Sequence, residues 1–304
     1  MKAAIDIGTN TVLLLVADVI SGQLKPVHEE QRIPRLGRGV DADRIINEEA
    51  TRRVSEALRE YKVILENDFS DVEDVIVTAT SAVRDARNRE EFMASIKEET
   101  GFEIRLLSGR EEAEWTAAGA LSVLDIPSDS ETLILDIGGG STEIAYLNNG
   151  EVVDGHSYDM GSVRFTERFL KSDPPSKVEI ERCREEIQRF YGDRLFDIVN
   201  DPVAVGVAGT VTTLAAITQD LRSYQPEKLA GFTLKRSHIE EVIHEFATRG
   251  SQEMLERYPV YLRGRADIFM AGMLILEGFL DQFELNSLTV STGGIRHGAL
   301  LKLH

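Results

Sequence analysis

Two carboxylates flank a glycine turn near the middle of the chain. Residues 133–144 read LILDIGGGSTEI, an apolar strand that ends on Asp136, then three glycines, two hydroxyls and Glu143. Glycines permit a turn tight enough to point consecutive backbone N–H groups into one concavity, which suits an anion. Asp136 and Glu143 supply the oxygen ligands that a hard cation prefers. Taken alone, the same pattern equally fits a plain β-hairpin.

A related turn at the N-terminus favours the anion site. Residues 2–15 read KAAIDIGTNTVLLL, and placing Asp6 on Asp136 brings Gly8 onto Gly138 and Thr11 onto Ser141. Two such strand–turn–strand units predict an internal duplication in which each half supplies a phosphate loop. The candidate phosphate-binding residues of the two loops are Gly8, Thr9, Asn10 and Thr11, and Gly138, Gly139, Gly140, Ser141 and Thr142.

Hydroxyl groups also follow two strands that lead into helices. The apolar residues 75–79 run into Thr80-Ser81 and Arg84, and residues 203–207 run into Gly209-Thr210. The first turn of a helix offers free N–H groups and a positive potential, so both junctions suit an anion. Gly209 and Thr210 therefore join the phosphate-binding candidates.

A third helix start contains two adjacent glutamates. Ser108 and Glu111 have the spacing of a capping box, in which Glu111 reaches back to the Ser108 N–H. Glu112 lies about 100° further around the helix and is free for other work. From spacing alone, Glu112 is more often an ordinary first-turn glutamate that interacts favourably with the helix dipole. Capping boxes are also predicted for Asn88 with Glu91, Ser176 with Glu179 and Ser237 with Glu240, and Asn47 is predicted to cap a helix.

Length and patterning predict an α/β protein. The 304 residues are enough for two domains of ordinary size, and strands and helices are mixed in both halves. We expect an N-terminal domain at 1–124 and a C-terminal domain at 125–304, with a helix near 295–304 that could pack back onto the first domain. A cleft between two similar domains would be lined by the glycine turns.

Charge and cysteine content restrict the partners and the compartment. A formal net charge of −18 argues against nucleic acid and against an anionic membrane surface. Cys183 is the only cysteine, so an intrachain disulfide is excluded. The chain shows no leader and no apolar stretch long enough to span a bilayer, and we therefore expect a cytoplasmic protein. The six histidines show no zinc-ligand spacing.

A phosphate-binding protein this acidic must concentrate its arginines locally. The loop at 31–39 contains three arginines, two glycines and a proline, and it fits a solvated loop as well as one that contacts phosphate. We expect a positive wall in the first half of the chain, formed by Arg32, Arg35, Arg38, Arg84, Arg87 and Arg89.

Together these motifs resemble the exopolyphosphatase/guanosine pentaphosphate phosphatase family of the sugar kinase–Hsp70–actin superfamily. The similarity spans the chain and keeps the family's order. It is carried by residues 6–11, 79–86, 107–113, 136–143, 160–164, 209–210, 265–267 and 293–296.

The resemblance implies two actin-like (ribonuclease H-like) domains around a central cleft. It implies release of the terminal phosphate from inorganic polyphosphate, guanosine pentaphosphate or both, with Mg²⁺ or Mn²⁺. Glu112 then matches the base that activates water, which reverses the interpretation from spacing, and Arg84 matches a phosphate-contacting arginine. Asp136 matches a metal-associated carboxylate and Glu143 a second essential one, with Asp6 as a further metal candidate.

Some questions stay open at this level. The longer family members carry a C-terminal helical extension that this sequence lacks. Tight binding of long polymers and formation of a homodimer through that extension therefore stay open. Two other functions also fit the superfamily: an ATP-dependent small-molecule kinase, and a non-catalytic nucleotide or polyphosphate sensor.

Overall fold

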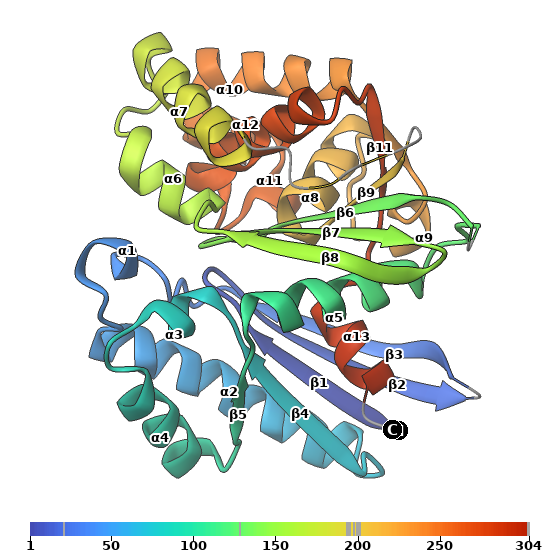
Figure 1. Ribbon diagram of the computed structural model, residues 1–304. Coiled ribbons are helices and arrows are strands. Elements are labelled where there is room, and N and C mark those ends of the chain that lie inside the picture. The colour runs from blue at the N-terminus through green and yellow to red at the C-terminus, as the bar shows by residue number, and fades with distance from the viewer. Residues whose placement is uncertain (21, 128, 193–195, 197, 199–201, 303–304) are drawn as a thin grey trace. The chain divides into compact units, whose positions relative to one another are not determined.

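The computed structural model describes residues 1–20, 22–127, 129–192, 196, 198 and 202–302 (Figure 1). Its internal contacts divide the chain into two units. The first unit joins Met1–Ser122 with Gly293–His304, and the second is Val123–Thr292. No helix in the described part of the chain is long and apolar enough to cross a membrane.

The first unit is built on a five-stranded sheet in the order β3-β2-β1-β4-β5. An antiparallel meander forms one side of it, and two strands parallel to β1 form the other. The strands are β1 (Lys2–Ile7), β2 (Val12–Ile20), β3 (Gln23–Arg32), β4 (Asp74–Ala79) and β5 (Ile104–Leu106).

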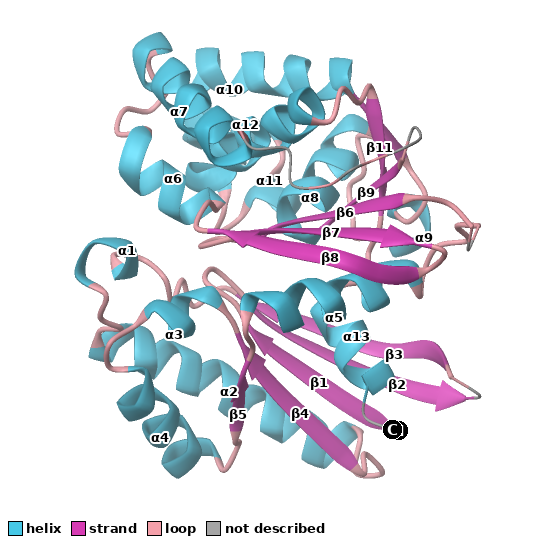
Figure 2. Ribbon diagram, viewed as in Figure 1, coloured by secondary structure: helices cyan, strands magenta, loops and turns pink. Residues whose placement is uncertain are grey.

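Helices cover both faces of this sheet (Figure 2). Side chains alternate along a strand, so Ile5 and Leu14 pack with the core beneath α2 while Ala4 and Leu15 pack with α5 and α13. The helices of the unit are α1 (Val40–Asp43), α2 (Glu48–Asp68), α3 (Ser81–Asp85), α4 (Arg89–Thr100), α5 (Gly109–Leu121) and α13 (Ile295–Lys302).

The second unit contains a six-stranded sheet in the order β10-β11-β9-β6-β7-β8. Its strands are β6 (Thr132–Ile137), β7 (Thr142–Asn148), β8 (Glu151–Tyr158), β9 (Val203–Val207), β10 (Thr233–Lys235) and β11 (Ser287–Val290). Its helices are α6 (Ser162–Phe169), α7 (Lys177–Tyr191), α8 (Ala208–Thr218), α9 (Pro226–Leu229), α10 (Arg236–Arg257), α11 (Pro259–Leu262) and α12 (Ala266–Gln282). The apolar α12 lies at the centre of the helical layer, in contact with α6, α7 and α10.

The predicted duplication is confirmed by the topology. The order β8-β7-β6-β9-β11 repeats β3-β2-β1-β4-β5, with β10 as an added edge strand. In each repeat the last of these strands leads into a helix, β5 into α5 and β11 into α13. Both helices belong to the first unit, where they pack against each other.

Three of the predicted helix caps are confirmed. Asn47 accepts from the Ala50 N–H, and complete capping boxes form at Ser108 and Ser176. The prediction for Asn88 is wrong because its amide is used elsewhere: it accepts from the Ile46 N–H and donates to the Ile46 carbonyl. The prediction for Ser237 is also wrong, because α10 begins at Arg236 and Ser237 is its second residue.

The crossing of α5 and α13 depends on glycine. A Cβ atom on Gly119 would lie 2.0 Å from the carbonyl oxygen of Gly294, and one on Gly298 would lie 1.9 Å from that of Trp115. Backbone atoms cannot rotate away from such a contact, so the two helices approach this closely only without side chains at these positions.

We expect Gly119→Ala to destabilise the first unit by about 1–3 kcal/mol, the usual cost of overpacking. Gly294→Ala is the matched control, because a Cβ at Gly294 meets no atom within 4 Å. Trp115, the only tryptophan, lies in this contact and reports on urea unfolding by fluorescence. Equal unfolding midpoints for the two variants would contradict the role given to Gly119.

Candidate active site

The first glycine turn joins β1 to β2. The Gly8 N–H donates to the Thr11 carbonyl at 2.9 Å and closes the turn. Asp6, at the end of β1, is 8% exposed and accepts a 3.1 Å hydrogen bond from the Thr78 hydroxyl of β4. This bond fixes the orientation of the carboxylate beside the turn.

Two neighbouring segments fasten the turn in place. The N–H groups of Arg35 and Gly37 donate to the carbonyls of Asn10 and Thr9, at 3.0 and 2.7 Å. On the other side, the Thr9 hydroxyl lies 3.4 Å from that of Ser81, at the start of α3. The strand-to-helix junction after β4 therefore lies beside the first glycine turn.

Arg84 and Glu112 form an ion pair in the same unit. Nη1 of Arg84, on α3, donates to Oε2 of Glu112 at 2.8 Å and to the Leu107 carbonyl at 3.1 Å. The Glu112 side chain is 6% exposed and that of Arg84 is 23% exposed. The pair is a charge-assisted hydrogen bond that holds the Glu112 carboxylate in place.

The helix that carries Glu112 is held by its neighbour in sequence. Oε2 of Glu111 accepts from the N–H and the hydroxyl of Ser108. These bonds, with a further one from Arg105, lower the pKa of Glu111. Glu111 therefore caps the helix, and Glu112 is left to face Arg84.

The second glycine turn joins β6 to β7 and repeats the closing bond of the first. The Gly138 N–H donates to the Ser141 carbonyl at 3.0 Å. Asp136 and Glu143 are directly paired across the two strands, so their side chains lie on one face of the sheet. They are 7% and 2% exposed, and Oε1 of Glu143 accepts from the Ser157 hydroxyl at 2.5 Å.

The start of α6 clamps this turn from one side. The N–H groups of Ser162 and Val163 donate to the carbonyls of Gly138 and Gly139, at 3.0 and 2.8 Å. Because these carbonyls are occupied there, the turn's N–H groups are directed elsewhere. Among the described residues no acceptor is found for the N–H groups of Gly139, Gly140 and Ser141. Such a set of N–H groups is an anion-binding concavity.

The third candidate junction lies beside this turn. Val207, the last residue of β9, pairs with Asp136, so Gly209 and Thr210 in the first turn of α8 follow the strand end next to Asp136. Gly209 also has a packing role, because a Cβ there would lie 2.5 Å from Nη1 of Arg265. That guanidinium donates to the Gly209 carbonyl and to the Thr213 hydroxyl. Burial lowers the pKa of Arg265.

The structure thus assembles the predicted residues into two groups, one in each unit. Asp6, the turn at 8–11, Arg84 and Glu112 belong to the first unit, and Asp136, the turn at 138–142, Glu143, Gly209 and Thr210 belong to the second. Arg265 was not predicted as a site residue and entered only through the resemblance at 265–267. The sequence signal that could have identified Arg265 is its position immediately before an apolar helix.

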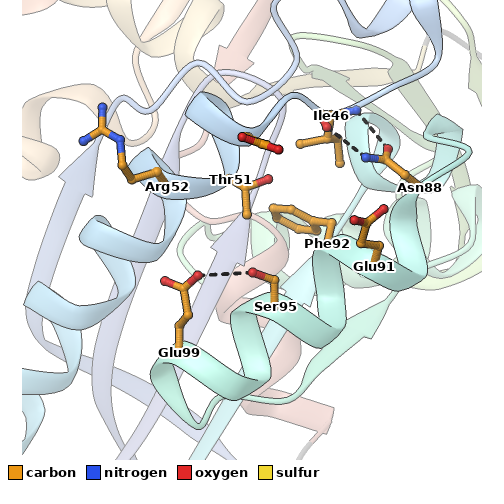
Figure 3. A pocket seen from close by; sticks show the side chains of 9 residues that line it. Ile46, Thr51, Arg52, Asn88, Glu91, Phe92, Ser95 and Glu99 are labelled. Atoms are coloured by element: carbon orange, nitrogen blue, oxygen red, sulfur yellow. Dashed lines mark hydrogen bonds between the residues drawn. The ribbon is translucent and has the colours of Figure 1, made fainter.

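A separate pocket in the first unit has the wrong chemistry for phosphate (Figure 3). It holds about 230 Å³ between α2 and α4, over Ile46 and Phe92. Glu48, Glu91 and Glu99 line it, and none of the candidate residues does. The Ser55 hydroxyl bond to Glu99, followed by those from Ser95 and Arg59, lowers the pKa of that carboxylate. A phosphate group would meet like charge there.

Comparison with known proteins identifies the family. The model of the Ppx/GppA phosphatase family matches residues 15–304. The chain belongs to this family. The match begins after the first glycine turn, but similarity to whole proteins includes that turn as well. Exopolyphosphatase 2 of Mycobacterium tuberculosis is 35% identical over 316 residues, covering 99% of this chain and 98% of that protein.

Solved structures of the family share the fold. The Aquifex aeolicus Ppx/GppA protein superposes with a TM-score of 0.82 at 32% identity, covering 98% of this chain and 95% of its own. An exopolyphosphatase from Cytophaga hutchinsonii reaches 0.87 at 27% identity, with 98% and 96% covered. The predicted two-domain actin-like α/β fold is therefore confirmed, and the protein is a phosphatase by family.

The clamp on the second turn predicts a sensitive position at Gly161. A Cβ there would lie 2.5 Å from the carbonyl of Gly139 and 2.6 Å from Gly140. We expect Gly161→Ala to displace the turn and to lower kcat/KM for phosphate release by about 10–100-fold, since small misplacements of binding groups are costly.

Thr166→Ala is the control for this prediction. Thr166 lies on the same helix, its hydroxyl has no hydrogen-bond partner among the described residues, and the change keeps every bond of the clamp. Its kcat/KM should stay close to that of the unsubstituted protein. Unfolding curves of both variants separate a displaced turn from a loss of fold. A Gly161→Ala protein that is folded and fully active would contradict the clamp.

Proposed function

We propose that this protein is a phosphoanhydride hydrolase that releases the terminal phosphate of inorganic polyphosphate. The observation that carries the proposal is the partly buried Arg84–Glu112 ion pair, in which a carboxylate at a helix start faces an arginine. Two glycine turns of identical construction and a relative named exopolyphosphatase, aligned over nearly its full length, support it.

The glycine turns would bind the phosphate oxygens. In the second turn, the N–H groups of Gly139, Gly140 and Ser141 would supply donors. In the first turn, where the Gly8 N–H closes the loop, Thr9, Asn10 and Thr11 would supply backbone and hydroxyl groups. The N-terminal turn of α8 at Gly209 and Thr210 adds a positive potential. Phosphoryl transfer needs positioning and charge neutralisation above all, and these groups provide both.

Glu112 would be the general base. It accepts a proton from water as the water oxygen bonds to the terminal phosphorus and the bridging P–O bond breaks. The bonding pair leaves with the bridging oxygen. Arg84 is close enough to Glu112 to orient it and carries a fork of donors suited to a phosphate oxygen.

A divalent cation fits the carboxylates of the second unit. Among the residues that the structure describes, no three His, Cys, Asp or Glu side chains gather into a metal-binding group. Mg²⁺ suits a site with only two protein carboxylates, since it is commonly held by one or two carboxylates together with water and substrate phosphates. Asp136 and Glu143 would hold it. When bound, the cation would neutralise charge on the phosphate oxygens.

A kinase and a sensor are less well supported. A phosphatase family assignment favours transfer to water over transfer to an alcohol or a carboxylate acceptor. A sensor would not need a base at Glu112. Purified protein incubated with Mg²⁺ and with polyphosphate, guanosine pentaphosphate or ATP, with free phosphate as the readout, tests the choice. Release from polyphosphate without an acceptor is the expected result, and release from none of them would refute the proposal.

We expect Glu112→Gln to keep substrate binding and to lose about 10²–10⁴-fold in kcat, the usual contribution of a general base. Glu111→Gln is the matched control, because glutamine can replace glutamate in a capping box. Equilibrium binding and phosphate release are measured for both. Turnover by Glu112→Gln close to that of the control would rule out Glu112 as the base.

Removal of the metal gives a second prediction. A chelator should abolish phosphate release, and added Mg²⁺ should restore it. Asp136→Asn weakens a carboxylate ligand, so half-maximal activity should require a higher Mg²⁺ concentration than in the unsubstituted protein. Ser130→Ala, a change outside the site in the same unit, should leave that concentration unchanged. Full activity in chelator would contradict a metal-dependent reaction.

A further inference from the structure

Three polar side chains form one row across the sheet of the second unit. Asp136 on β6 is directly paired with Glu143 on β7, and Glu143 is directly paired with Ser157 on β8. Directly paired residues carry their side chains on the same face of a sheet, so all three share one face. Leu135 and Ile137, which flank Asp136, belong to the apolar core. Because side chains alternate along a strand, the row lies on the opposite face from that core.

Ser157 holds one oxygen of Glu143. Its hydroxyl donates to Oε1 of Glu143 at 2.5 Å, a short bond typical of a hydroxyl and a carboxylate. Glu143 is 2% exposed, so little water competes for this bond. Because β8 and β6 flank β7 on opposite sides, the bond draws Oε1 toward β8 and away from Asp136. A carboxylate held in this way does not turn both of its oxygens toward Asp136.

The duplication does not account for this serine. The corresponding row of the first repeat is Asp6, Leu13 and Gln31. Leucine and glutamine there take the places of the glutamate and the serine. The hydroxyl that holds Asp6 comes instead from Thr78, on the strand at the other side of β1. The serine and the second carboxylate therefore occur together in one repeat only, which indicates a joint role.

The two common hard cations make different demands on a carboxylate. Ca²⁺ takes about six to eight oxygens in a flexible geometry, and one carboxylate often gives it both of its oxygens. Mg²⁺ is smaller, requires a nearly ideal octahedron and keeps several water molecules. The narrow bite of a two-oxygen carboxylate fits such an octahedron poorly. A carboxylate with one oxygen fixed elsewhere therefore suits Mg²⁺ better than Ca²⁺.

We propose that Ser157 is a positioning residue that makes the pair of Asp136 and Glu143 selective for Mg²⁺ over Ca²⁺. The inference rests on the metal site of the proposed function and adds the residue that selects the cation. By holding Oε1 toward β8, the serine leaves Glu143 one oxygen for a cation and fixes the orientation of that oxygen in advance. Without the hydroxyl, Glu143 is able to turn and offer both oxygens, which favours Ca²⁺.

The test measures metal binding without substrate, with Mn²⁺ as the probe. Mn²⁺ binds the same kinds of oxygen ligand, and its electron paramagnetic resonance signal distinguishes the free ion from the bound ion. Mg²⁺ or Ca²⁺ is then added as a competitor. The Ca²⁺ concentration that displaces half of the probe, divided by the corresponding Mg²⁺ concentration, measures the selectivity. Mn²⁺ that the Asp136→Asn variant still binds belongs to other carboxylates of this acidic chain and is subtracted.

We expect Ser157→Ala to lower this ratio by about tenfold or more, the usual effect of losing a partner that orients a metal ligand. A purely structural loss would weaken the binding of both cations equally and leave the ratio unchanged. Ser157→Thr keeps the hydroxyl at a strand position that suits threonine, and it should restore the ratio. Ser130→Ala, elsewhere in the same unit, should also keep it. Unfolding curves establish that each variant is folded.

The outcomes separate this inference from the proposed function. An unchanged ratio in Ser157→Ala, or an equal decrease in Ser157→Thr, overturns the selectivity role and leaves the hydrolase. Equal Mn²⁺ binding by the unsubstituted protein and by Asp136→Asn overturns it as well, because the carboxylate pair then holds no cation. Phosphate release from polyphosphate is measured separately. Its absence refutes the hydrolase alone, and the competition experiment still decides the role of Ser157.

Discussion

The direction of a few peptide groups controls what the second glycine turn can bind. A peptide unit has its N–H and its C=O on opposite sides, so occupying one side with donors turns the other toward a ligand. The start of α6 occupies the carbonyls of Gly138 and Gly139. The same start approaches so closely that Gly161 has no room for a side chain. The direction of the N–H groups proposed to bind phosphate therefore depends on a helix about 20 residues later in the sequence.

The two repeats share this plan but have diverged in their ionisable groups. Glu143 pairs with Asp136 in the second repeat, whereas Leu13 pairs with Asp6 in the first, so only the second presents two adjacent carboxylates. The last helices of the two repeats, α5 and α13, differ the other way, because only the helix of the first repeat carries a carboxylate at the equivalent position. Glu112 is the fourth residue of α5, and the fourth residue of α13 is Gly298, which must be small to pass Trp115. The pair of adjacent carboxylates and the proposed base, Glu112, thus come from different copies of one repeated unit.

Much of this could be predicted because the signals are local. A glycine turn, or a serine three residues before a glutamate, is stabilised by groups close in sequence, and the turns and the boxes at Ser108 and Ser176 formed as predicted. The cap at Asn88 failed because Ile46, which is distant in sequence, engages its amide. Gly119 and Gly161 are explained by backbone atoms of other segments, and no spacing rule could reveal these contacts.

The local charge around a site is likewise hard to predict from sequence, because it depends on ion pairs between residues that are distant in the chain. Composition gives the total charge, but binding of a polyanion depends on which arginines remain unneutralised after folding. Arg32 and Arg38 are six residues apart, and each adds one positive charge to the total. In the fold, two glutamates neutralise Arg32, whereas Arg38 is exposed next to Gly37, which packs on Thr9. Because opposite charges this close largely cancel each other's field, an acidic protein can attract phosphate wherever folding leaves arginines unpaired. The excess of carboxylates elsewhere would repel a polyanion from the rest of the surface.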